Sequence, residues 1–112
     1  MPTATKSVDE LFRALSDPTR RGVVRHLAQG RASVSELAAP FDMALPSFVQ
    51  HLRVLEASGV VRSTKAGRVR TYQLVPKRLK MAEDWLAAQR SMWEQRLDRF
   101  EKYVHQLDRS ES

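Results

Sequence analysis

Cysteine is absent from this 112-residue chain, so a disulfide framework, a thiolate zinc site and a cysteine nucleophile are all excluded. Long apolar runs are missing as well. The opening residues, MPTATKSVDELF, contain no apolar segment of the kind that directs secretion, and no stretch approaches about eighteen uncharged apolar residues. We therefore expect a cytoplasmic protein without a membrane partner.

Glycine is scarce, with four residues, and none of them belongs to a glycine-rich phosphate loop. No serine occupies a nucleophile-elbow motif. The length predicts a single domain over residues 1–112, whose one modest core leaves no room for a large pocket. We therefore expect no enzymatic activity and no cofactor.

Acidic residues are sparse in the middle of the chain, and their scarcity decides where the net charge of +6 lies. Residues 20–72 contain nine basic and three acidic side chains, whereas residues 1–19 and 73–112 are each close to neutral. A basic excess confined to one segment favours a localised anionic partner, for which nucleic acid is the obvious candidate. The alternative is that scattered arginines merely solvate helices.

Helix-capping signals divide the first half of the chain into four helices. Ser7 with Glu10, and Ser33 with Glu36, each have the spacing of a capping box. Asp17 precedes a proline that suits the first position of a helix. The predicted helices run from Ser7 to Leu15, from Pro18 until Gly30, from Val34 to Phe41 and from Leu45 to Ser58.

Two strand-like runs follow, VVRST at residues 60–64 and VRTYQLV at residues 69–75. Gly67 lies between them and suits the positive φ of a hairpin turn. We expect Val60, Val69 and Tyr72 to face the core. Two helices joined by a turn and followed by a basic hairpin have the layout of a winged helix-turn-helix. The predicted fold class is therefore α+β, mostly α, with residues 34–58 as the helix-turn-helix and residues 60–74 as a two-stranded wing.

A recognition helix must keep one stripe in the core while it offers polar side chains to base edges in the major groove. In the fourth helix Phe48, Leu52 and Leu55 have the spacing of the buried stripe. Side chains off that stripe are predicted to contact bases, and the basic side chains of the wing to contact phosphates or the minor groove. These predicted DNA contacts are Ser47, Gln50, His51, Arg53, Lys65, Arg68 and Arg70.

The last predicted helix, residues 77–107, has no glycine or proline and is about 45 Å long at 1.5 Å per residue. Apolar side chains recur along it at alternating steps of four and three, the spacing of a coiled-coil seam. Such a helix is longer than a small domain can cover, which predicts a dimerisation helix. The seam residues are Trp93, Leu97, Phe100, Val104 and Leu107.

Several short motifs, taken together, resemble the ArsR type of bacterial winged-helix repressors. They occur in order between about residues 11 and 74, and the tail at residues 82–97 resembles the metal-independent SdpR-like branch. The resemblance implies a homodimeric transcriptional repressor whose first and last helices form the dimer interface. The motifs are LSDPTRR at 15–21, VSELA at 34–38, Leu45-Pro46, HLRVL at 51–55, Gly59-Val60-Val61 and Gly67-Arg68.

On this basis the expected dimer contacts are Val8, Leu11, Phe12, Trp93, Leu97, Phe100 and Val104. The sequence departs from the family at two positions. Ala44 stands where a serine usually caps the recognition helix, and Val49 stands where serine is more common on the DNA face. Val49 joins the predicted DNA contacts, because an exposed valine there suits a thymine methyl group. The alternative is that the helix rotates slightly and Val49 lies in the core.

Metal sensing is common among ArsR-type proteins, but this chain has serine at the two positions that resemble the family's cysteine pair, Ser33 and Ser35. Serine is a poor metal ligand beside thiolate or imidazole. We therefore expect no metal. A site built from His105 and a carboxylate of a second chain is the alternative.

The sequence thus predicts a homodimeric repressor that binds double-stranded DNA at an inverted-repeat operator, with no effector identified. Two other functions stay open. One is a winged helix that serves only as a protein-interaction adaptor, and the other is a ligand- or metal-responsive sensor of the same family. A neutral or acidic wing would favour the adaptor, whereas residues 53–72 contain five basic residues and one acidic residue.

Overall fold

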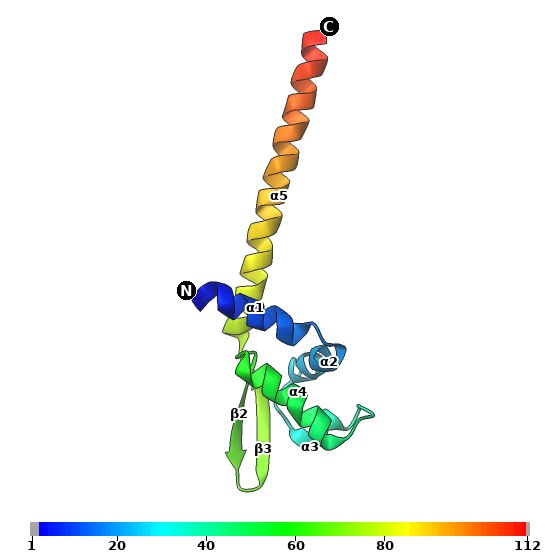
Figure 1. Ribbon diagram of the computed structural model, residues 1–112, viewed down its shortest axis with the longest axis vertical. Coiled ribbons are helices and arrows are strands. Elements are labelled where there is room, and N and C mark those ends of the chain that lie inside the picture. The colour runs from blue at the N-terminus through cyan, green and yellow to red at the C-terminus, as the bar shows by residue number, and fades with distance from the viewer. Residues whose placement is uncertain (1–2, 112) are drawn as a thin grey trace. The chain divides into compact units, whose positions relative to one another are not determined.

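The computed structural model describes residues 3–111, with side chains described for residues 8–109. Contacts divide the chain within its last helix, between Ala82 and Glu83. We call the first part the winged unit and the second part the C-terminal unit. The elements are α1 (Thr3–Leu15), α2 (Pro18–Leu27), β1 (Ala32–Ser33), α3 (Val34–Ala38), α4 (Leu45–Ala57), β2 (Val61–Ala66), β3 (Val69–Leu74) and α5 (Pro76–Glu111) (Figure 1).

The predicted fold class is confirmed. The chain is mostly helical, with a small antiparallel sheet and a long final helix. Helix α1 begins four residues before Ser7, so Ser7 is not the N-terminal cap that its spacing suggested. The expectation of one domain over residues 1–112 stays a prediction.

The sheet has three strands in the order β1-β3-β2, one more than the sequence predicted. The hairpin pairs Val61 with Leu74 at its base and Ala66 with Val69 at its tip. The missed strand, β1, is two residues long and pairs with Tyr72 and Thr71 of β3. Its second residue, Ser33, also caps α3, so the capping signal concealed the strand.

The core of the winged unit lies among α1, α2, α3, α4 and the base of the hairpin. Phe48, Leu52 and Leu55 of α4 are completely buried, as their spacing predicted. Val60 and Tyr72 are buried too, but Val69 is 53% exposed, so the expectation that it faces the core was wrong. Side chains alternate between the two faces of a strand, and residues 69 and 72 therefore cannot share a face.

Local capping interactions mark the starts of α2 and α3 and the end of α4. Asp17 caps α2 through a 3.0 Å bond from the Arg20 backbone N–H, and Ser33 and Glu36 form the predicted capping box on α3. Helix α4 begins after Ala44, which provides no side-chain cap, and ends at Ala57, two residues before Gly59, whose φ is 83°. The Val60 N–H bonds to the Leu55 carbonyl and the Gly59 N–H to the Glu56 carbonyl, the pattern of a Schellman motif.

We expect Asp17→Asn to destabilise the protein at neutral pH but not at strongly acidic pH. Burial raises the pKa of Asp17, but its bond from the Arg20 N–H and the nearby charges of His51 and Arg20 outweigh that effect, so the pKa lies below its ordinary value of 3.8. A carboxylate with a lowered pKa contributes stability above that ordinary value and loses it as the pH falls through the folded-state pKa. Asparagine is an equally good cap, so the substitution removes the charge and keeps the geometry.

Urea unfolding at fixed protein concentration, at pH 7 and at a series of values below 4, measures this difference. Asp42→Asn, at an exposed loop position, controls for the loss of one carboxylate. A difference between the wild type and Asp17→Asn that stays constant over the whole range would contradict the assignment.

Candidate nucleic-acid interface

Helix α4 presents a mixed polar and apolar surface on the side opposite its buried stripe. Ser47, Gln50 and Arg53 are exposed there, as predicted. Proline at the second helical position and the absence of acidic residues from the first turn leave the positive end of the helix dipole uncompensated by side chains. Such an end suits a polyanion.

Val49 is partly exposed and is absent from the described side chains that pack against the core. This placement favours the expectation that it faces outward over the alternative that it is buried. Val54, which was not among the predicted DNA contacts, is 37% exposed and lies on the same outward surface as Gln50. Its spacing of four from Gln50 was the available signal.

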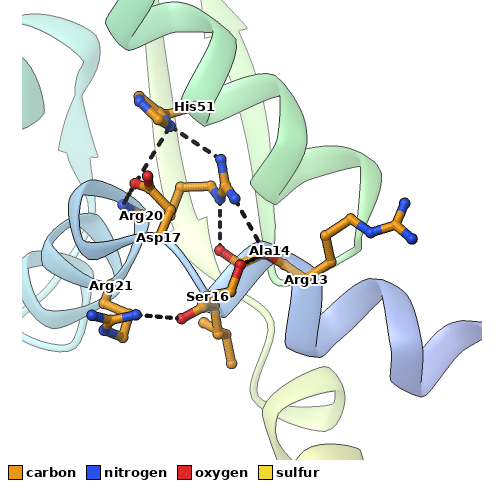
Figure 2. A network of polar contacts seen from close by, with 8 residues as sticks. Arg13, Ala14, Ser16, Asp17, Arg20, Arg21 and His51 are labelled. Atoms are coloured by element: carbon orange, nitrogen blue, oxygen red, sulfur yellow. Dashed lines mark hydrogen bonds and ion pairs between the residues drawn. The ribbon is translucent and has the colours of Figure 1, made fainter.

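His51, a predicted DNA contact, has partners within the chain. Its Nδ1 lies 3.2 Å from Nη1 of Arg20 and 3.6 Å from Oδ2 of Asp17, and its side chain is only 24% exposed (Figure 2). The imidazole is therefore engaged with the junction of α1 and α2 and not offered on the outward surface of α4. His51 precedes the buried Leu52 on α4, so its side chain lies at the edge of the buried stripe and not on the opposite, outward surface.

The wing ends in a two-residue turn, Gly67-Arg68, that places basic side chains at its tip. Gly67 has φ 63° and Arg68 does not have a positive φ, the pattern of a type II′ hairpin turn. Lys65 and Arg68 are exposed, and the tip extends past the helices of the winged unit (Figure 1). These two cations are well placed to meet phosphates.

Arg70 is also exposed, but it has a partner within the chain. Its Nη1 donates to the Ser63 hydroxyl at 2.8 Å, and that hydroxyl donates to Oε1 of Glu56 at 2.6 Å. Burial raises the pKa of Tyr72, and the negative charge of Glu56 adds to the increase. Glu56 belongs to α4, so this chain of contacts fixes the base of the wing to the recognition helix.

We expect Arg68→Glu to weaken binding to every duplex by a similar factor and to reduce the salt dependence. Each phosphate contact contributes about 0.9 to the slope of log affinity against log salt concentration, because binding releases condensed cations. Mobility-shift titrations from about 50 to about 300 mM salt measure that slope. Arg25→Glu, a matched charge reversal at an exposed position of α2, controls for net charge. Equal slopes for Arg68→Glu and the wild type would exclude the wing tip from the interface.

The C-terminal unit exposes a continuous apolar stripe along α5. The predicted seam residues Trp93, Leu97, Phe100, Val104 and Leu107 are between 38% and 63% exposed. The stripe is wider than predicted, because Met92 and Tyr103 are 58% and 57% exposed on the same side. A stripe of this kind on one helix needs a partner to bury it.

The expected contribution of α1 to a dimer is narrower than the sequence suggested. Leu11 is completely buried in the core of its own chain, so its placement among the dimer contacts was wrong. Its side chain packs inward because α1 lays one face on α2. Val8 and Phe12 remain partly exposed.

Within residues 3–111, no helix is both long and apolar enough to cross a membrane. In the same part of the chain, no group of three or more His, Asp or Glu side chains is arranged to hold a metal ion. Ser33, one of the two serines at the family's metal positions, is instead occupied in the capping box of α3.

Comparison with known proteins agrees with a winged helix-turn-helix fold. A family model described as a helix-turn-helix domain matches residues 15–64. The HTH-type transcriptional regulator Rv2034 of Mycobacterium tuberculosis (strain ATCC 25618 / H37Rv) is 42% identical over 71 residues, which cover 63% of this chain and 66% of the relative. The transcriptional repressor SdpR of Bacillus subtilis (strain 168) is 29% identical over 79 residues, 70% of this chain and 88% of the repressor.

The crystal structure of the ArsR family transcriptional regulator RHA00566 superposes with a TM-score of 0.77 at 50% identity, covering 80% of this chain and 93% of that one. The chain spans between about half and two thirds of the length of the first curated relatives that it matches. All these proteins are described as regulators or repressors of transcription, and the prediction that the chain is not an enzyme is confirmed. The chain belongs to the ArsR family of helix-turn-helix transcriptional regulators.

Proposed function

We propose that this protein is a cytoplasmic homodimer that binds an inverted-repeat operator through α4 and the wing and represses transcription by blocking access to the promoter. The observation that carries the proposal is the pairing of two exposed surfaces in one chain. One is the polar outward face of α4 with the basic wing tip, and the other is the apolar stripe on α5.

The chemistry of the first surface suits double-stranded DNA. Gln50 can bond bidentately to adenine and Arg53 to guanine, while Ser47 is a more permissive donor and acceptor. Val49 suits the methyl group of thymine. Lys65 and Arg68 at the wing tip suit phosphates or the edges of the minor groove, where binding is electrostatic.

The second surface suits a second copy of the chain. Identical helices can bury identical stripes across a two-fold axis, and two recognition helices related by that axis match an inverted repeat. Dimerisation would also double the positive charge that faces the DNA.

We further propose that the protein belongs to the metal-independent, SdpR-like branch of the family and that no metal controls it. The hydroxyl of Ser33 accepts a 3.2 Å bond from the Glu36 N–H and so has a structural use in place of a ligand role. The match to SdpR, which covers 88% of that repressor, supports the same assignment.

Insertion of half a helical turn tests the two-fold model. Half-sites in such complexes lie about one turn, or about 10 bp, apart. Adding about 5 bp between the halves of a bound inverted repeat moves them to opposite faces of the duplex. We expect this insertion to reduce affinity to that of one half-site, and an insertion of about 10 bp to restore part of it. Equal affinity for all three duplexes would contradict a rigid dimer that reads both halves.

Transcription from a template with the repeat across its promoter tests repression. We expect transcript to fall as the dimer occupies the repeat, with no added metal and no effect of a chelator. Increased transcript would indicate an activator, and a chelator-sensitive response would favour the metal-sensing alternative.

A further inference from the structure

One arginine joins three elements of the winged unit at a single point. The guanidinium of Arg20, on α2, donates from Nε to the Ala14 carbonyl at 2.7 Å and from Nη2 to the Arg13 carbonyl at 3.2 Å, both at the end of α1. Its remaining nitrogen, Nη1, lies 3.2 Å from Nδ1 of His51 on α4. Figure 2 shows the side chain extended between the two helices.

The chemistry of this contact is directional. A guanidinium only donates, so the 3.2 Å contact between Arg20 and His51 is a hydrogen bond when Nδ1 of His51 carries no proton and accepts. The carbonyls at the end of α1 have no partner within that helix, and a cation there also compensates the negative end of the helix dipole. Asp17 lies against both residues, because its carboxylate accepts from the Arg20 N–H and lies 3.6 Å from His51.

The neighbouring arginine provides a natural comparison. Arg21 has the same charge and also donates to the end of α1, from Nη1 to the Leu15 carbonyl at 2.9 Å. Its side chain is exposed, and no contact with α4 is among those described for it. The two arginines therefore differ in whether they reach the recognition helix.

We propose that Arg20 is a positioning residue that sets the rotation of α4 through His51, and that it acts on which sequence is bound more than on how strongly DNA in general is bound. This inference rests on the proposed function. It gives His51 and Arg20 a role inside the protein, whereas the sequence had placed His51 among the DNA contacts and Arg20 in the basic segment.

The physical reason is the precision that base contacts demand. Bidentate bonds from Gln50 or Arg53 to a base edge are lost when the helix rotates by a small angle. A flexible cationic side chain at the wing tip can change its conformation and keep its contact with a phosphate. The planar fork of arginine can bond the α1 carbonyls and His51 together. Lysine keeps the charge but has one nitrogen, so it cannot hold all three groups in the same geometry.

The experiment compares affinities of the intact protein for its best-bound duplex and for a scrambled duplex of equal length and composition. The variants are Arg20→Lys, His51→Ala, their combination, and Arg21→Lys as the matched control. We expect Arg20→Lys and His51→Ala each to lower the ratio of the two affinities by about tenfold, with the scrambled-duplex affinity and the salt slope unchanged. The double variant should be no worse than Arg20→Lys alone, because His51 acts through its contact with Arg20. Arg21→Lys should leave the ratio unchanged.

His51→Gln extends the test to a conservative change. The glutamine side-chain oxygen can accept a bond from Arg20, so this variant should recover most of the lost ratio while circular dichroism confirms that the fold is retained. An Arg20→Ala variant whose salt slope falls by about one would show a phosphate contact instead. Additive losses, or an equal loss in Arg21→Lys, would overturn the coupling to His51. A wild-type protein with no preference between the duplexes would overturn the proposed function itself, before any variant is compared.

Discussion

Replacing Leu97 and Phe100 by aspartate is expected to convert the protein into a monomer that no longer binds its operator. Both side chains lie on the apolar stripe of α5 and are 45% and 63% exposed in the isolated chain. A two-fold interface contains each of them twice. Burial of a fully exposed side chain of this size contributes about 1.5–3 kcal/mol. Because Leu97 and Phe100 are each about half exposed in the isolated chain, the four copies together contribute about 3–6 kcal/mol to the dimer, before charge repulsion is counted.

Sedimentation velocity measures the assembly, and a mobility shift on the same samples measures DNA binding. Loss of the second should follow loss of the first, because one recognition helix alone contacts a single half-site. Ser91→Asp combined with Gln95→Asp adds the same charge on the opposite side of α5 and is the matched control. A monomer that binds the full operator with wild-type affinity would contradict the two-fold model.

Arg53→Ala is expected to weaken operator binding by about 1–3 kcal/mol per half-site and to remove discrimination at one base pair in each half. Arg53 is exposed on the outward face of α4, close to Gln50, where a guanidinium can bond to both O6 and N7 of guanine. Affinity measurements with each base pair of the half-site substituted in turn locate the position. The loss should concentrate at a guanine.

Arg53→Lys separates the two ways in which this residue can act. Lysine restores a phosphate contact but lacks the planar fork that matches guanine, so it should recover little of the discrimination. A loss that is uniform over all substituted duplexes would place Arg53 on a phosphate. No loss at all would remove it from the interface.

Local signals predicted much of the winged unit. The capping residues Asp17 and Ser33 mark where α2 and α3 begin, because an N-cap bond involves residues only three apart. Gly59 and Gly67 have the positive φ that their positions required. The buried stripe of α4 follows from helical spacing alone. Each of these features depends on a few neighbouring residues and is therefore visible in the sequence.

The features that the sequence did not predict correctly depend on contacts between distant parts of the chain. His51 has the spacing of a partly exposed residue on α4, and its engagement with Arg20 becomes visible only when α1, α2 and α4 are packed together. Strand β1 forms because the edge of β3 is available for pairing. A run of two residues is too short to predict a strand from the sequence. Leu11 satisfies the same helical pattern whether it faces its own core or a second chain. Helical periodicity shows that a face is apolar, and the tertiary structure decides what covers it.

Some candidate DNA contacts could be predicted from local spacing, whereas others depend on tertiary contacts. The exposure of Ser47, Gln50 and Arg53 follows from the spacing of the buried stripe, which the sequence contains. The anchoring of Arg70 by Ser63 and Glu56 depends on strand register and on the packing of the wing against α4. Arg70 is therefore a less simple probe of phosphate contact than Lys65 or Arg68, because its replacement also disturbs the base of the wing.

Selection of bound duplexes from a random pool at physiological salt tests the central claim most directly. The intact protein should enrich an inverted repeat whose halves are about one helical turn apart, because two recognition helices related by a two-fold axis read the same sequence on opposite strands. Enrichment of a single unrepeated site would contradict the symmetric dimer. No enrichment of any sequence would contradict specific DNA binding and favour a winged helix that serves as a protein-interaction adaptor.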